Sequence, residues 1–389
     1  MEDLLKNKLN SVFSDYQLTT ETKDLYDEVL SNLRAAAKDL KADGKSDVDA
    51  AIQAFSEIGD LTEVLNEITN KTLVYSKNNI SIYNENQLKL ANDQTFNPTE
   101  IESIKLSYSS DNVEILASSD GKIHLYEYMN SENPDFFAQI QKTGGHLSIQ
   151  AGVRPRLFGV FVPFRTKIIL ALPVNFTGDL DVDNRSGNMN VQEISLSSLM
   201  MNVRSGNFKL ADVEVQDFSL DLSSGNGKFE NLTTEKLYIN AKSGNLKGDK
   251  MIAENVQIIA DSGNCVFENV HFIGLDLKLN SGNIKLLNSF SIEANLTTNS
   301  GNVVAEVVGF KALKAKSDSG NVRISVPRDM VFDFDLKSGS GSSEIALDGV
   351  SYEVKKEKRK TGSRRGNASN QAILRGESGC GNVSVKEVL

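Results

Sequence analysis

The residue types that most often carry catalysis or hold metals are sparse in this chain of 389 residues, and they share no spacing. The three histidines are His124, His146 and His271, and the two cysteines are Cys265 and Cys380. Two cysteines are too few for a disulfide framework or a structural zinc site. His271 stands between two apolar repeat positions, so its side chain is predicted to point outward.

The carboxylates suggest no active site either. A hydrolase or lyase groove needs paired carboxylates, but Asp212, Asp217, Asp221 and Asp261 occupy different positions in the repeat described below. No phosphate-binding glycine loop follows a strand, and the Gly-Gly-x-Gly-x-Asp calcium repeat is absent. We therefore expect a protein that is not an enzyme and that uses no cofactor.

One basic cluster stands out in an acidic chain. The net charge is −10, which argues against a general nucleic-acid binder. Each Lys or Arg near an anionic membrane contributes about 1 kcal/mol, so the cluster is a candidate for reversible, salt-sensitive binding to anionic lipid or wall polymer. The alternative is a solvated, disordered loop. The basic residues are Lys355, Lys356, Lys358, Arg359, Lys360, Arg364 and Arg365.

A sequence repeat predicts the secondary structure that positions these histidines, cysteines and charged residues. Ser-Gly-Asn returns every 19 residues, eight times, from Gly187 to Gly320, and Gly339 keeps the register as Ser-Gly-Ser. A fixed period near 20 residues marks a solenoid. Stacked coils bury one another's apolar faces and pair their strands in parallel at about 4.8 Å. The sequence predicts a mainly β fold: a parallel β-solenoid (β-helix) of 19-residue coils with a small N-terminal α-helical bundle.

Apolar residues recur at fixed distances from each repeat glycine. Positions 2 and 4 after Gly, and positions 12, 14 and 16, alternate with polar residues, which is the periodicity of a strand. Each coil is therefore predicted to have two main strands and a short third one. Cys265 falls at position 2 and is predicted to be a small core residue. Position 7 holds Ile194, Val213, Leu232, Met251, Val270 and Val308.

The asparagines that follow the repeat glycines are predicted to form a structural ladder at one corner. Gly allows a tight corner with positive φ, and side-chain amides one coil apart can hydrogen-bond to each other. A ligand-binding surface is the alternative interpretation. The column consists of Asn188, Asn207, Asn226, Asn245, Asn264, Asn283, Asn302 and Asn321.

Residues 1–70 are predicted to form four short helices, and they contain 15 acidic and 7 basic residues. Apolar residues lie at helical spacing in each segment. Asp43-Gly44 ends the second helix, Ser46 begins the third, and Asp60 begins the last. Such a module could dock on a protein partner, or it could be a solvated bundle without one.

Flanking segments complete the predicted organisation. Short strand-like runs precede the regular coils at Ile101–Leu106, Val113–Leu116, Lys122–Tyr128 and His146–Ile149. The predicted parts are an acidic helical module (1–70), irregular early coils that cap the N-terminal end (72–165), the regular solenoid (166–350), and a basic loop with C-terminal capping strands (351–389).

Two segments resemble known families. The repeats, with Lys167–Pro173 and Ser378–Val383, resemble the DUF4097 family of adhesin-like proteins with β-strand repeats. Asp43–Ser46, Ala50–Ile52 and Phe55–Leu61 resemble the HAAS (DUF1700-like) helical module of bacterial envelope proteins. A helical head on such a solenoid is also similar in architecture to the LiaX-type envelope-stress proteins of Gram-positive bacteria.

These resemblances imply a non-enzymatic sensor or regulator of envelope stress, with a protein partner on residues 1–70. The alternatives are an adhesin-like surface binder and a cytoplasmic adaptor that docks on a regulator or membrane protein. No signal peptide or membrane-spanning segment is visible, because Arg165, Lys167, Pro163 and Pro173 interrupt the most apolar stretch. A cytoplasmic location is therefore expected, and the resemblance adds a peripheral membrane or cell-surface one.

Overall fold

The computed structural model describes residues 2–13, 20–42, 45–46, 50–51, 53–55, 88–153, 164–364 and 372–388. The chain forms two compact units, Met1–Ile82 and Tyr83–Leu389.

The N-terminal unit contains the helices α1 (Glu2–Phe13) and α2 (Thr20–Ala42). Apolar residues of the two helices meet in its core, where Leu5 and Leu9 pack in one cluster with Val29 and Leu33. The chain is helical again at residues 50–51 and 53–55, within the third predicted helix. The last predicted helix lies outside the described residues.

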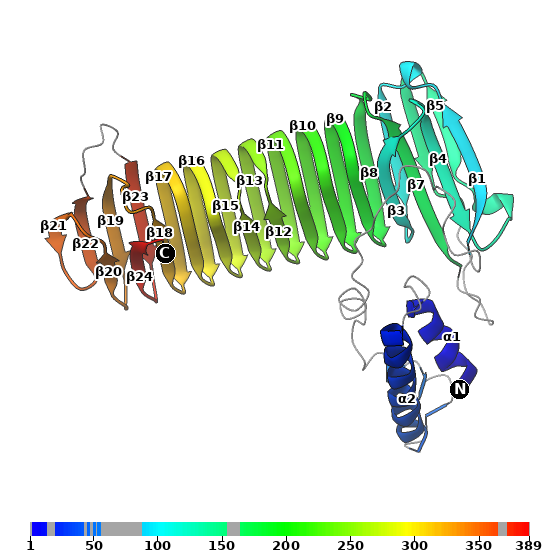
Figure 1. The fold of residues 1–389 in the computed structure, drawn as a ribbon, viewed down its shortest axis with the longest axis horizontal. Coiled ribbons are helices and arrows are strands. Elements are labelled where there is room, and N and C mark those ends of the chain that lie inside the picture. Colours follow the sequence, from blue (N-terminus) through cyan, green and yellow to red (C-terminus); the bar gives the residue numbers. More distant parts are fainter. Residues whose placement is uncertain are drawn as a thin grey trace. The chain divides into compact units, whose positions relative to one another are not determined.

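The second unit contains the predicted parallel solenoid of 19-residue coils (Figure 1). Neighbouring coils pair in parallel with a 19-residue offset, as in the pairing of Lys209 with Lys228. Its regular strands are β8 (Asp179–Ser186), β9 (Met189–Ser205), β10 (Phe208–Ser224), β11 (Gly227–Ser243), β12 (Leu246–Asp249), β13 (Ile252–Ser262), β14 (Cys265–Glu268), β15 (His271–Ser281), β16 (Ile284–Ser300), β17 (Val303–Ser319) and β18 (Val322–Val326).

Each regular coil consists of three straight segments. Between β10 and β11 the pairing is interrupted at Asp212 and again at Gln216, which are positions 6 and 10 of the coil. The inward residues follow the predicted positions and add position 9, which the sequence pattern had not indicated. In β10 they are Phe208, Leu210, Val213, Val215, Phe218, Leu220 and Leu222.

Two kinds of corner turn the chain. At the first, the glycine of each Ser-Gly-Asn tripeptide has positive φ, and a Cβ built on Gly263 would lie 1.8 Å from the carbonyl oxygen of Gly244. Glycine is therefore required both by φ and by the close approach of the coil before it. At position 6 the second corner uses non-glycine residues in the left-handed region, with φ from 44° to 56°. These are Glu193, Asp212, Asn231, Lys250, Asn269 and Asn288.

One coil departs from this rule, and the prediction for Val308 is wrong. Val308 is 52% exposed, whereas Val307 is buried. The pairing of β16 with β17 shifts register here, so that Ser289 pairs with Val307. Val307 occupies position 6 but has no positive φ. The strand therefore continues its alternation, which places Val307 inward and Val308 outward.

Both ends of the solenoid are intercalated. The coil β2–β3 pairs on one side with β6 and β7 and on the other with β8 and β9. The N-terminal elements are β1 (Lys89–Phe96), η1 (Pro98–Glu100), β2 (Ser103–Tyr108), β3 (Asn112–Ser118), β4 (Ile123–Met129), η2 (Pro134–Phe136), β5 (Gln139–Thr143), β6 (His146–Gln150) and β7 (Thr166–Pro173). Each predicted strand-like run thus overlaps one of these strands.

The C-terminal end is built in the same way. The coil that comes last in the sequence, β23–β24, is not the last in space, because it lies between β17–β18 and β19–β20 (Figure 1). The predicted capping strands form but are not the cap, because β22 and then β21 close this end in antiparallel pairing. The elements are β19 (Phe332–Ser338), β20 (Ser343–Ala346), β21 (Val350–Lys355), β22 (Arg359–Arg364), β23 (Ala372–Ser378) and β24 (Val383–Glu387).

Candidate binding surfaces

The predicted basic loop is a β-hairpin in the described residues. We call residues 355–360, which join β21 to β22, the cationic turn. Its backbone is held on the last corner of the solenoid: Ser338 N donates to Lys358 O (2.8 Å) and Ser343 N donates to Glu357 O (2.8 Å). The alternative of a disordered loop is therefore wrong for this turn.

The basic side chains of the hairpin divide into two groups. Lys355, Lys356 and Lys358 are exposed, and the ammonium group of Lys355 lies 4.9 Å from the ring centre of Tyr352. Arg359 instead donates to Asp335 (3.3 Å) on β19. Solvated ammonium groups on a fixed turn are available to an anionic partner.

Lys360 and Arg364 have structural roles. Lys360 Nζ donates to the carbonyl oxygens of Ser343 and Lys356, and so ties the turn to the corner. Arg364 is only 6% exposed. Its guanidinium donates to the carbonyl oxygens of Asp348 (3.0 Å), Pro327 (3.1 Å) and Arg328. These carbonyls satisfy a buried cation. Arg365 lies outside the described residues.

The asparagine column is a continuous hydrogen-bonded ladder in its central part. Asn264 Nδ2 and its backbone N both donate to Asn245 Oδ1, at 3.1 and 3.0 Å. Asn112 and Asn382 add a rung at each end. Because each asparagine Oδ1 accepts hydrogen bonds from the next coil, the geometry of the column is that of a structural ladder that stabilises the corner.

The histidines and cysteines do not come together. His124 contacts Asp120 (2.8 Å), and this hydrogen bond lowers the pKa of the Asp120 carboxyl. His146 contacts Ser103 (2.6 Å), while His271 is exposed, as predicted. Burial raises the pKa of the Cys265 thiol to about 12, as its predicted core position requires. No group of three or more potential metal ligands occurs among the described residues.

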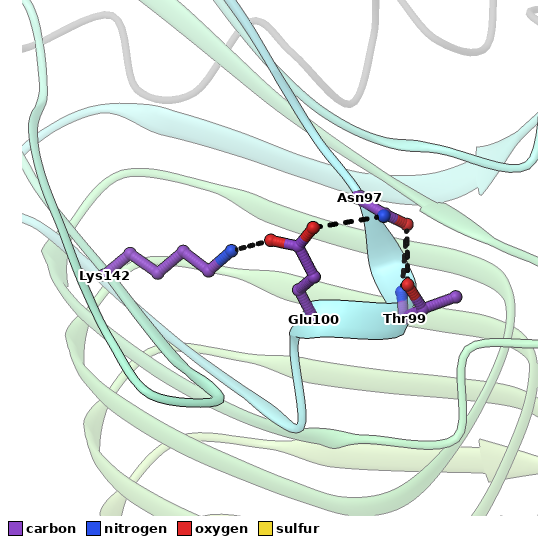
Figure 2. Close-up of polar contacts among 4 residues, drawn as sticks. All are labelled: Asn97, Thr99, Glu100 and Lys142. Carbon is purple, nitrogen blue, oxygen red and sulfur yellow. Dashed lines mark hydrogen bonds and ion pairs between the residues drawn. The ribbon is translucent and has the colours of Figure 1, made fainter.

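A polar network fastens η1 to β5 at the N-terminal end (Figure 2). Asn97 caps η1 by accepting from Thr99 N (3.2 Å), and it donates to Glu100 Oε1 (3.2 Å). Lys142 pairs with the other oxygen of Glu100. The Lys142 ammonium lowers the pKa of the Glu100 carboxyl. Each polar group here has a partner within the network, which indicates a structural role.

A groove that sequence reasoning missed crosses one face of the solenoid. It has a volume of about 630 Å³ and runs over β11, β13, β15, β16, β17 and β23. Its walls are the outward residues at positions 11 and 13 of successive coils. The available signal was the small size of Gly274 and Ala312 at position 11, where neighbouring coils carry Asn255 and Glu293. The register of the strands is needed to show that these small residues lie on one outward face and leave a groove there.

Parallel coils stacked through an apolar core, with polar faces on the outside, define a β-solenoid protein. Residues 101–226 and 217–386 match the Toastrack DUF4097 family. The chain therefore belongs to that family, as the repeat predicted. The match does not include residues 1–100, so the HAAS-like and LiaX-type resemblances stay predictions.

Several solved structures are similar to this chain. A "putative cell adhesion protein" from Clostridium sporogenes ATCC 15579 has 11% identity and a TM-score of 0.29, over 78% of this chain and all of that one. A "putative adhesin" from Parabacteroides distasonis ATCC 8503 has 15% identity and a TM-score of 0.36, over 76% and 96%. A "putative lipid binding protein" from the same organism has 14% identity and a TM-score of 0.32, over 79% and 99%. No curated protein matches the chain.

None of the helices in the described part of the chain has the length and apolar character needed to span a membrane.

Proposed function

We propose that this protein is a non-enzymatic binding protein whose cationic turn attaches it reversibly to an anionic membrane or wall polymer. One observation carries the proposal: Lys355, Lys356 and Lys358 are exposed on a turn that backbone hydrogen bonds fix to the end of the solenoid. A fixed turn loses less conformational entropy on binding than a flexible loop does.

The expected strength of this attachment follows from the three exposed lysines. At about 1 kcal/mol for each lysine near an anionic surface, they contribute about 3 kcal/mol. That free energy corresponds to roughly a hundredfold in affinity. Arg359, Lys360 and Arg364 add positive potential but are occupied by Asp335 and by backbone carbonyls.

A finer role as a sensor or regulator of envelope stress is part of the proposal. In it, residues 1–70 dock on a protein partner while the solenoid serves as the scaffold. Residues 1–70 contain 15 acidic and 7 basic residues, so we expect their partner to present a basic surface. An adhesin-like surface binder and a cytoplasmic adaptor are the alternatives, and cellular location separates them.

Co-sedimentation of the full chain with vesicles tests the proposed attachment. We expect binding to vesicles that contain phosphatidylglycerol and none to vesicles of phosphatidylcholine alone. The variant K355Q/K356Q/K358Q should lose roughly a hundredfold in affinity. The matched control K242Q/K247Q/K285Q removes three exposed lysines elsewhere on the solenoid and should bind like the original protein. Equal binding by both variants would reject the cationic turn as the site.

Protease accessibility of a tagged protein on intact and lysed cells tests the location. Cleavage on intact cells would support a surface sensor or adhesin. Protection until lysis would place the protein inside the cell and favour the sensor or adaptor. Partners that bind residues 1–70 would then be sought by affinity purification with the tagged full chain.

A further inference from the structure

The groove across the solenoid face has the size and composition of a ligand site. Its volume of about 630 Å³ lies within the range of roughly 300–1,000 Å³ that is typical of such sites. It is hollow because Gly274 and Ala312 have little or no side chain at position 11, while Glu293 between them is exposed. From β11 to β23 it crosses six strands, which is about 24 Å at 4.8 Å per strand.

Some polar side chains of this groove lack the hydrogen bonds that amides make at other outward positions. At the neighbouring outward positions 15 and 17, side-chain amides bond to the preceding coil, as Asn240 does to the carboxylate of Asp221 (2.9 Å) and Asn299 to Asn280 (2.9 Å). In the groove, the side chains of Asn255, Gln257 and Glu293 form no hydrogen bond with any residue in the described part of the chain. These groups can therefore donate to and accept from a ligand.

The two ends of the groove differ in character. At one end Tyr238 is 39% exposed and offers a flat apolar surface. At the other end Lys314 and Arg375 are exposed register neighbours on β17 and β23. Two adjacent cations there attract a negative group. Asp276, which also lines the groove, is neutralised by Lys278 (2.6 Å) and bonded by Asn295 (2.7 Å).

We propose that this groove binds an extended acidic oligosaccharide across the coils. Sugar hydroxyls would bond to Asn255, Gln257 and Glu293, a sugar ring would pack on Tyr238, and a sugar carboxylate would bind Lys314 and Arg375. The backbone donors and acceptors of the groove floor are used within the sheet, so an extended peptide cannot pair with it. This ligand site is separate from the cationic turn.

Isothermal titration calorimetry of the full chain with short oligogalacturonates tests the proposal. Neutral malto-oligosaccharides and poly-glutamate serve as comparison ligands. We expect saturable binding of the oligogalacturonates, roughly tenfold weaker in K314Q/R375Q because hydrogen bonds to charged groups are lost. A312F, which fills the groove from an outward position, should abolish binding, and Y238A should weaken it.

The charge-matched control is K285Q/R323Q, which removes one exposed lysine and one exposed arginine from the position-3 column and should leave binding unchanged. Circular dichroism should show that each variant keeps its fold. No saturable binding of oligogalacturonates would overturn the proposal, as would binding that A312F leaves intact or that poly-glutamate reproduces.

Discussion

At the residue scale, the repeat glycine is the strictest requirement of the fold. Gly263 has a φ of 124°, and an added Cβ would meet the carbonyl oxygen of Gly244 at 1.8 Å. Left-handed strain alone costs about 1–3 kcal/mol, and here the backbone of the neighbouring coil must move as well. We therefore expect G263A to lower the melting temperature by several degrees.

Gly274 supplies a matched control for that substitution. A Cβ added there would have its nearest neighbour at 3.7 Å, and its φ is not positive. G274A should therefore leave the melting temperature almost unchanged, or raise it slightly by reducing the freedom of the unfolded chain. Equal effects of the two substitutions would contradict the corner assignment.

The buried thiol of Cys265 predicts a dependence of stability on pH. Its pKa is raised to about 12, so the folded state keeps a proton that the unfolded chain releases near pH 8.5. This contribution to the free energy of unfolding is fully present below about pH 8.5 and is lost as the pH rises toward 12. By pH 10 the loss amounts to about 2 kcal/mol. Urea unfolding at about pH 8 and pH 10 should show a larger loss for the original protein than for C265V. Equal losses would mean that the thiol is not buried.

At the element scale, the inserted coil β23–β24 stabilises the C-terminal end of the solenoid by packing between β17–β18 and β19–β20. Leu374 on β23 is fully buried between β17 and β19, whereas Ile373 beside it is 46% exposed. L374A should cost about 2–5 kcal/mol, as large-to-small core substitutions do. It should also make β19–β22 more sensitive to limited proteolysis, while I373A should do neither. Equal protease sensitivity of the two variants would show that β23 does not support the cap.

The elements also show which features a sequence can predict. The 19-residue repeat predicted the coils and their inward columns because Ser-Gly-Asn recurs unchanged and strands alternate with period two. The second corner was missed, since residues as different as Glu193, Lys250 and Asn269 occupy its left-handed position. Val308 was misplaced because one coil lacks that corner and its register shifts.

The repeat could not predict the pairing between strands that are distant in the sequence. Nothing local in β23 indicates that it lies between β17 and β19, because intercalation depends on contacts with both neighbours. The groove was missed for a similar reason: it arises from side chains that Gly274 and Ala312 lack. The basic cluster was found by its charge alone, but only the structure separated the exposed Lys356 and Lys358 from the buried Arg364.

At the scale of the whole molecule, the two proposals place different partners on two surfaces of the solenoid. The cationic turn joins β21 to β22 at the C-terminal end and presents charge on a fixed backbone. The groove lies on a face and presents unpaired amides between an aromatic ring and two cations. An electrostatic attachment depends on salt, because ions screen exposed charges within about 8–10 Å at physiological salt.

The salt dependence of vesicle binding tests the central claim most directly. The affinity of the full chain for phosphatidylglycerol vesicles would be measured from about 0.01 to 1 M salt, where the screening length falls from roughly 30 to 3 Å. The account predicts that affinity falls steadily with salt for the original protein, and that K355Q/K356Q/K358Q shows weak, nearly salt-independent binding. Affinity that salt does not change, or that the variant retains, would contradict it.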